Sequence, residues 1–178
     1  MSGDLRPWWD RGEPWATYLR PEMQQYALWK GIADRVVLPG WALERFLVSP
    51  VRRLLVIAAD WCGDATNTVP VFARLTELIA GMELRVLERD RHLELMDAYR
   101  TDGSRSIPIV IALDNGLQEL GHWGPRPRLL QEWMMEHRKL MPSPQRYDYA
   151  RQWYARDRGA APLEELLQQV DGARDVNP

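Results

Sequence analysis

The chain of 178 residues contains a single cysteine, Cys62, and this residue constrains the possible chemistry more than any other. Cys62 follows an apolar run at residues 54–59 and begins a segment with a helical pattern. A thiol at a strand-to-helix junction lies near unpaired backbone N–H groups, which favour the thiolate. An intramolecular disulfide needs two cysteines. Redox chemistry at Cys62 must therefore use a thiol from another molecule in the second half of each cycle.

The three histidines do not suggest a metal site. His92, His122 and His137 are widely spaced and form no ligand pattern with Cys62 or with one another. No phosphate-binding glycine motif occurs either. The sequence therefore predicts neither a metal nor another cofactor.

The charge pattern argues against a nucleic-acid partner. The chain has 23 Lys and Arg against 25 Asp and Glu, a net charge of −2, and its basic residues are spread along the sequence. Its first residues lack the pattern of a signal peptide, and no apolar stretch approaches the length of a membrane span. We expect a cytoplasmic protein with no membrane partner, in which a free thiol stays reduced. The sequence does not indicate its oligomeric state.

The hydrophobic pattern predicts an α/β protein. Residues 54–59 are apolar on both alternations, which is typical of a central strand buried on both faces. A helix should follow, with Pro70 kinking it about two turns in and Gly81 closing it. Asn115-Gly116 supplies the positive φ angles of a tight hairpin turn. The other expected elements are helices at 23–37, 41–48, 91–100 and 129–141, strands at 84–88, 107–113 and 117–123, and two amphipathic segments after 142.

Three features give the chain a family resemblance. Trp61-Cys62-Gly63 begins the helix, Pro70 lies eight residues after the cysteine, and Ile107-Pro108 opens a later apolar strand. With the order of elements, these features resemble the thioredoxin fold over residues 51–140. The segments 60–65, 103–108 and 123–127 are similar to a bacterial subgroup whose motif, here Trp-Cys-Gly-Asp-Ala, often lacks the second cysteine.

The resemblance implies a thioredoxin-like α/β fold with a central mixed sheet flanked by helices. We expect one domain in three parts: an N-terminal helical extension packed on the core (1–50), the core (51–140) and a C-terminal helical tail (141–178), with 171–178 unstructured. The nine tryptophans should mainly pack the core and the helices, apart from Trp61.

The chain departs from thioredoxin at three positions. Ala65 stands in place of the resolving cysteine, Asp64 replaces the usual proline, and Val56 lies where thioredoxin keeps a buried aspartate. Ala65 excludes the internal disulfide, whereas the other two would only tune rate and potential.

The resemblance also implies the roles of the site residues. Cys62 would be catalytic and would form a mixed disulfide with a protein or small-molecule disulfide, which an external low-molecular-weight thiol resolves. We expect a partly exposed sulfur with a pKa below the usual thiol value of about 8.5. Asp64 could instead complement the helix dipole. Arg126, flanked by two prolines near a helix start, could form a structural ion pair or bind an anionic ligand, and the ion pair is the preferred interpretation. The expected docking residues are Trp61, Gly63, Asp64, Ile107 and Pro108, the last after a cis peptide bond.

Two alternatives from other classes stay open. The first is a non-catalytic module that binds an extended peptide in the same groove, with Cys62 incidental. The second is a monothiol iron–sulfur carrier, in which one cysteine from each of two subunits and two small thiols hold a cluster. No glutathione-binding signature supports the carrier.

Overall fold

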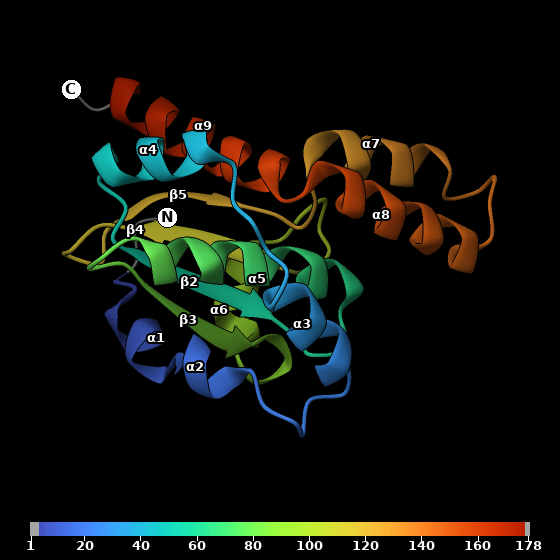
Figure 1. The fold of residues 1–178 in the computed structure, drawn as a ribbon, viewed down its shortest axis with the longest axis horizontal. Helices are drawn as coiled ribbons and strands as arrows, with labels where there is room; N and C mark the ends of the chain where they lie inside the picture. The colour runs from blue at the N-terminus through green and yellow to red at the C-terminus, as the bar shows by residue number, and fades with distance from the viewer. Residues whose placement is uncertain (1–3, 177–178) are drawn as a thin grey trace.

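The computed structural model describes residues 4–176 as a five-stranded mixed sheet covered by helices (Figure 1). The strand order is β1-β3-β2-β4-β5, with β2 and β3 parallel and the other neighbours antiparallel. The predicted α/β fold with a mixed central sheet is confirmed. The strands are β1 (Glu13–Pro14), β2 (Arg53–Ala58), β3 (Glu83–Glu88), β4 (Ile109–Leu113) and β5 (Glu119–Trp123).

Strand β2 lies at the centre of the sheet, as its apolar sequence predicts. Residues 54–58 are fully buried between β3 on one side and β4 on the other. A strand with helices on both faces has no solvent side, so both of its alternations must be apolar. Strand β2 ends at Ala58, and the short turn after it leads to Cys62.

Helix α5 (Gly63–Leu78) follows β2 and contains Pro70 in its interior. It ends close to the predicted boundary, and Gly81 has the left-handed φ of +82° that favours glycine after a helix. Helix α3 (Tyr26–Ala33) packs against α5. After β3, the turn η1 (Arg89–Arg91) leads into α6 (Leu93–Ala98), on the opposite side of the sheet from α5 in Figure 1.

The N-terminal segment contains three elements that the sequence did not predict. Helices α1 (Arg6–Arg11) and α2 (Trp15–Tyr18) flank β1, which pairs with β3 for only two residues. Elements of two to six residues are too short to show a hydrophobic period, so the only clear signal in this part of the sequence is its prolines. Helix α4 (Gly40–Val48) agrees with its prediction.

The C-terminal helices are α7 (Arg128–Glu136), α8 (Ser143–Asp157) and α9 (Ala160–Val176). Helix α9 lies along β5 and beside α4, whereas α7 and α8 extend from the core as an arm with their own small apolar cluster (Figure 1). The prediction that 171–178 is unstructured was wrong, because α9 continues to Val176; 177–178 lie outside the described residues.

The hairpin between β4 and β5 is present, but its turn differs from the prediction. The amide of Leu117 donates to the carbonyl oxygen of Asp114 at 3.2 Å, and the left-handed residue is Leu117, with φ of +66°. Gly116 does not have a positive φ. A four-residue turn over 114–117, whose last residue is the left-handed one, closes this hairpin, and the register of the two strands is irregular at Ala112 and Leu113.

None of the helices in the described part of the chain has the length and apolar character needed to cross a bilayer.

Candidate functional site

Cys62 is the N-cap residue of α5, at the end of the turn that leaves β2. Its amide donates to the carbonyl oxygen of Ala59 at 3.0 Å, and its own carbonyl oxygen accepts from the amide of Thr66 at 2.9 Å. The side chain is buried, with 7% of the residue exposed. The expected partly exposed sulfur is therefore wrong, because neighbouring segments cover it.

The sulfur of Cys62 contacts the segment that the sequence predicts beside it. Its Sγ donates to the carbonyl oxygen of Ile107 at 3.5 Å, and the peptide bond between Ile107 and Pro108 is cis. Burial raises the pKa of the Cys62 thiol, although the amides of Ala65 and Asp64 hydrogen-bond the sulfur and oppose this effect. The expected lowering of this pKa is wrong, because desolvation of the thiolate outweighs the helix N-terminus.

Asp64 lies buried in the first turn of α5, and two protein groups engage its carboxylate. The Tyr154 hydroxyl, from α8, donates to one oxygen at 2.9 Å. The Arg126 guanidinium forms an ion pair with the other at 2.5 Å, as the sequence predicts for that arginine. In this structure Asp64 lies in the first turn of α5, as the helix-dipole role requires, and it also attaches the start of α5 to the arm, a role that the sequence did not predict.

The loop that carries Arg126 packs directly on the Ile107–Pro108 segment. Gly124 has φ of +131°, and a Cβ atom there would lie 2.1 Å from the carbonyl oxygen of Pro108. Only glycine fits this approach. The same loop carries Arg126, which forms the ion pair with Asp64.

The N-terminal segment holds the loop before Cys62. The Trp29 indole N–H donates to the carbonyl oxygen of Asp60 at 2.9 Å, and the Gln25 side chain donates to that of Trp61 at 2.6 Å. Trp61 keeps 41% of its surface exposed, and the guanidinium of Arg89 lies 4.8 Å from the centre of its ring. The exposed indole is therefore oriented by protein contacts.

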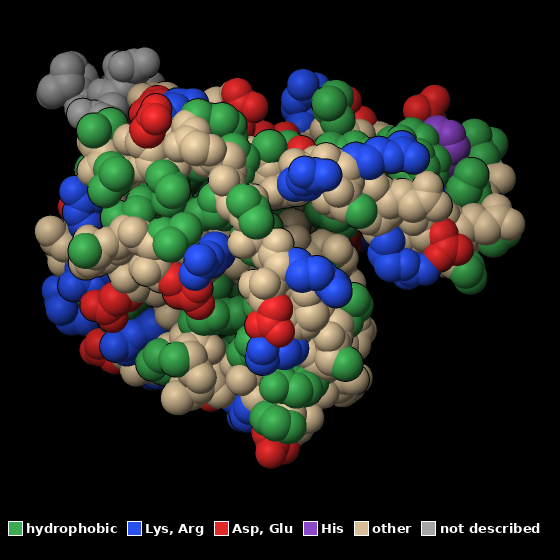
Figure 2. Space-filling model, viewed as in Figure 1, with side chains coloured by type: hydrophobic (Ala, Val, Ile, Leu, Met, Phe, Trp, Pro, Cys, Tyr) green, Lys and Arg blue, Asp and Glu red, His purple; other side chains and the backbone are tan. Residues whose placement is uncertain are grey.

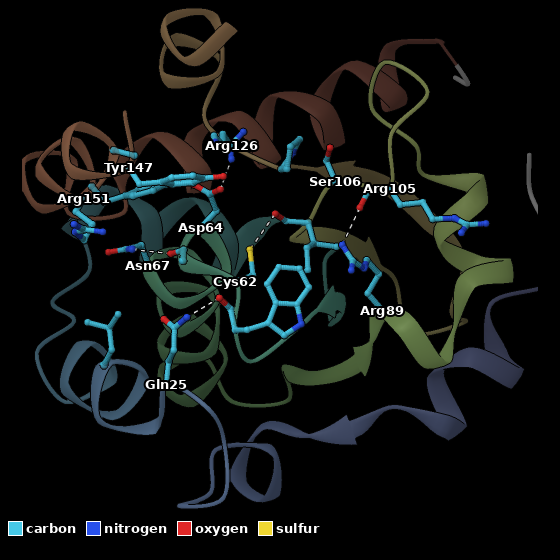
Figure 3. Close-up of a pocket in the computed structure, with 17 residues that line it drawn as sticks. Gln25, Cys62, Asp64, Asn67, Arg89, Arg105, Ser106, Arg126, Tyr147 and Arg151 are labelled. Atoms are coloured by element: carbon cyan, nitrogen blue, oxygen red, sulfur yellow. Dashed lines mark hydrogen bonds and ion pairs between the residues drawn. The ribbon is translucent and has the colours of Figure 1, made fainter. Parts of the chain in front are cut away.

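A cavity of about 550 Å³ opens beside Cys62. It lies under the arm, between the start of α5, the loop before β4 and helix α8; Figure 2 shows the hollow below the arm, and Figure 3 the lining side chains. Of the predicted site residues, five line it and Pro108 does not. Those five are Trp61, Cys62, Gly63, Asp64 and Ile107.

Sequence reasoning missed the part of the lining that comes from α8 and from two arginines. Four α8 residues face the cavity at spacings of three and four, namely Tyr147, Ala150, Arg151 and Tyr154. This spacing marks one helix face, but nothing in the sequence says that this face lies over Cys62. Arg89 and Arg105 also line the cavity, and Arg105 stands two residues before Ile107.

Within residues 4–176, no three His, Cys, Asp or Glu side chains are arranged so that they could hold a metal ion. His137 instead stacks on Trp133, and His122 contacts Glu119.

Comparison with known proteins identifies the family. A family model described as "Thioredoxin" matches residues 12–141, so the chain belongs to this thioredoxin family. The match includes both the cysteine motif and the Ile107–Pro108 segment. None of the curated proteins matches the chain.

Two solved structures share the whole fold. A protein of unknown function from Pseudomonas aeruginosa is 20% identical, with a TM-score of 0.73, and the match covers 96% of this chain and 99% of that one. An HIV epitope scaffold is also 20% identical, with a TM-score of 0.71 and the same coverage of both chains. At this identity the likeness concerns the fold alone, and it extends over the N- and C-terminal helices as well as the sheet.

Proposed function

We propose that this protein carries out thiol–disulfide exchange through Cys62, with an external low-molecular-weight thiol in place of a second cysteine. One observation carries the proposal: the Cys62 sulfur lies 3.5 Å from the carbonyl oxygen of Ile107, at the edge of an open cavity. A substrate sulfur in that cavity could meet Cys62, while extended backbone could pair beside Ile107. Trp61, Gly63, Asp64 and the Ile107–Pro108 segment would form the docking surface.

The exchange has two balanced steps. The Cys62 thiol first loses its proton to water, and the thiolate attacks one sulfur of a disulfide. A bond forms between Cys62 and that sulfur, the original S–S bond breaks, and the other half leaves as a thiolate that takes up a proton. An external thiolate then attacks the substrate sulfur of the mixed disulfide and releases Cys62. One disulfide and one thiol are consumed, and one of each is formed.

The bacterial subgroup with the Trp-Cys-Gly-Asp-Ala motif and a cytoplasmic location belong to the same proposal. A reducing compartment supplies the external thiol that the second step needs and keeps the resting Cys62 reduced.

One observation favours the second candidate, a non-catalytic binding module. Burial raises the pKa of the Cys62 thiol, and a raised pKa leaves less of the nucleophilic thiolate. In that case the cavity would bind its ligand without covalent chemistry. The iron–sulfur carrier would need a second subunit to bring its cysteine to the same cavity.

The test is an exchange assay with a small disulfide and an added thiol. We expect native protein to accelerate exchange only when the added thiol is present, and Cys62→Ser to be inactive. Ala65→Cys supplies the missing resolving thiol and should permit a first reduction without added thiol. Asn67→Cys is the matched control, because it adds a cysteine to the same helix, two residues beyond the position of the resolving cysteine. Equal rates for native protein and Cys62→Ser would contradict the proposal.

A further inference from the structure

Four arginines line the cavity beside Cys62: Arg89, Arg105, Arg126 and Arg151. Asp64 is the only acidic residue in the lining among the described residues, and its carboxylate forms an ion pair with Arg126. Four positive charges and one negative charge leave a net charge of +3 on the lining. In a protein with a net charge of −2, this concentration of positive charge is local and faces a hollow.

The arginines lie at both ends of the cavity, with the thiol between them. In Figure 3, Arg89 and Arg105 lie on one side of Cys62, beside Ser106, and Arg151 lies on the other side, beside Asn67. They come from separate elements: η1, the loop before β4, and α8. The Arg105 side chain extends away from Cys62 toward Asp97, so a ligand that spans the cavity would meet the guanidinium of Arg89 at one end and that of Arg151 at the other, with the sulfur between them.

The acids that pair with these three arginines do not line the cavity. They are Asp90 for Arg89, Asp97 for Arg105 and Asp148 for Arg151. All three carboxylates are at least 40% exposed. Single exposed ion pairs such as those of Arg89 and Arg151 are weak, because water and salt screen them, so a ligand carboxylate can compete for these two guanidinium groups. Asp97 holds Arg105 more firmly, through two hydrogen bonds of 2.6 and 2.8 Å.

The Asp97 carboxylate binds two guanidinium groups. It accepts hydrogen bonds from Arg105 and from Arg100, at 2.6 and 2.7 Å. One carboxylate cannot neutralise two guanidinium groups. Positive charge is therefore left over at the end of the cavity to which Arg105 belongs.

We infer that this cavity binds a low-molecular-weight thiol or disulfide that carries carboxylates at both ends, with its sulfur facing Cys62. Planar guanidinium groups bind carboxylates through paired N–H donors. The arginines are separated rather than gathered at one point, which suits single carboxylates better than a polyphosphate chain. The volume is that of a small-molecule site. The inference deepens the proposed function, since it names the substrate class and the external thiol, but binding itself requires no exchange.

The experiment measures binding with a probe that cannot react. S-methylglutathione has two carboxylates and a blocked sulfur, and its dimethyl ester is the same molecule without those charges. Calorimetric titration of the full-length protein and of Cys62→Ser should give the same dissociation constant for the acid. The ester should bind at least about 10-fold more weakly.

Two substitutions test the arginines. Arg89→Gln and Arg151→Gln each keep a polar side chain and remove a guanidinium from one end of the cavity, and each should weaken binding of the acid about 3- to 10-fold. Arg74→Gln is the matched control: Arg74 also pairs with an exposed acid, Glu77, but does not line the cavity, and its loss should leave binding unchanged. Circular dichroism of each variant checks that it is folded.

Three binding results would overturn the inference. Equal binding of acid and ester, or unchanged binding in both cavity variants, removes the role of the carboxylates. At least 10-fold tighter binding of S-methyl-coenzyme A would assign the arginines to phosphates. Failure of the exchange assay is a separate result: if the acid binds native protein and Cys62→Ser alike but no exchange occurs, the inference stands and the proposed function falls.

Discussion

The hydrogen bond from Tyr154 to Asp64 connects the arm to the start of α5, and its removal should destabilise the protein by a predictable amount. Both side chains are buried, and the acceptor is a carboxylate. Hydrogen bonds to charged groups contribute about 1.5–3 kcal/mol to stability. Asp64 would keep its ion pair with Arg126 in Tyr154→Phe, so the loss should fall in the lower part of that range, about 2 kcal/mol.

The assay is chemical denaturation of native and variant proteins under identical conditions. Chemical denaturation measures the loss in the free energy of unfolding directly. In thermal denaturation, a loss of about 2 kcal/mol corresponds to a fall in Tm of about 4–8 °C for a chain of this size. Tyr149→Phe is the matched control in the same helix, because the hydroxyl of Tyr149 makes no hydrogen bond within the described residues; it should change stability by less than about 0.5 kcal/mol.

Asp64→Asn provides the second arm of this test. It removes the charge that pairs with Arg126, whose side chain is only 17% exposed, and should cost more than Tyr154→Phe, about 3 kcal/mol. The double variant should cost less than the two single losses added together, because both substitutions act on one network. If Tyr154→Phe matches Tyr149→Phe, or the two losses simply add, the described attachment of the arm is refuted.

Three other predictions follow from the same contacts. Burial raises the pKa of Tyr154 well above 10, so the unfolded chain loses this proton at a lower pH than the folded protein does. The free energy of unfolding should therefore fall as pH rises above about 10, and it should fall less steeply in Tyr154→Phe. Burial also raises the pKa of Cys62, so iodoacetamide should alkylate the native thiol more slowly than the denatured one at pH 7. Gly124→Ala should cost about 2–4 kcal/mol, since its Cβ meets the Pro108 carbonyl, whereas Gly63→Ala, with open space, should change stability by less than about 0.5 kcal/mol.

The sequence predicted those parts of the fold that rest on long, regular patterns. The central strand and the helix after Cys62 have continuous apolar positions, so their boundaries differ from the structure by one or two residues. Strand β1 has two residues, and α2 has four, so neither can show a period. Leu117 was missed as the left-handed residue because Asn-Gly has the stronger local preference, and the register of the two strands overrode it.

The site was predictable only where a motif marks it. The contact between Cys62 and Ile107 follows from the family resemblance. The partners of Asp64 lie 62 residues away at Arg126 and 90 residues away at Tyr154, and no local pattern links them. The pKa of Cys62 was misjudged for the same reason. The helix N-terminus can be read from the sequence, but the segments that bury the sulfur cannot.

Trapping the mixed disulfide at Cys62 tests the central claim most directly. Reduced protein is mixed with an excess of glutathione disulfide at pH 8. Samples taken before and after addition of a free thiol are quenched with acid, and their mass is measured by intact-protein mass spectrometry. The account predicts a mass increase of one glutathionyl group, located at Cys62 by peptide mapping, absent in Cys62→Ser and reversed by the added thiol. A native protein that gains no mass under conditions in which the denatured chain does would show that the buried thiol takes no part in exchange.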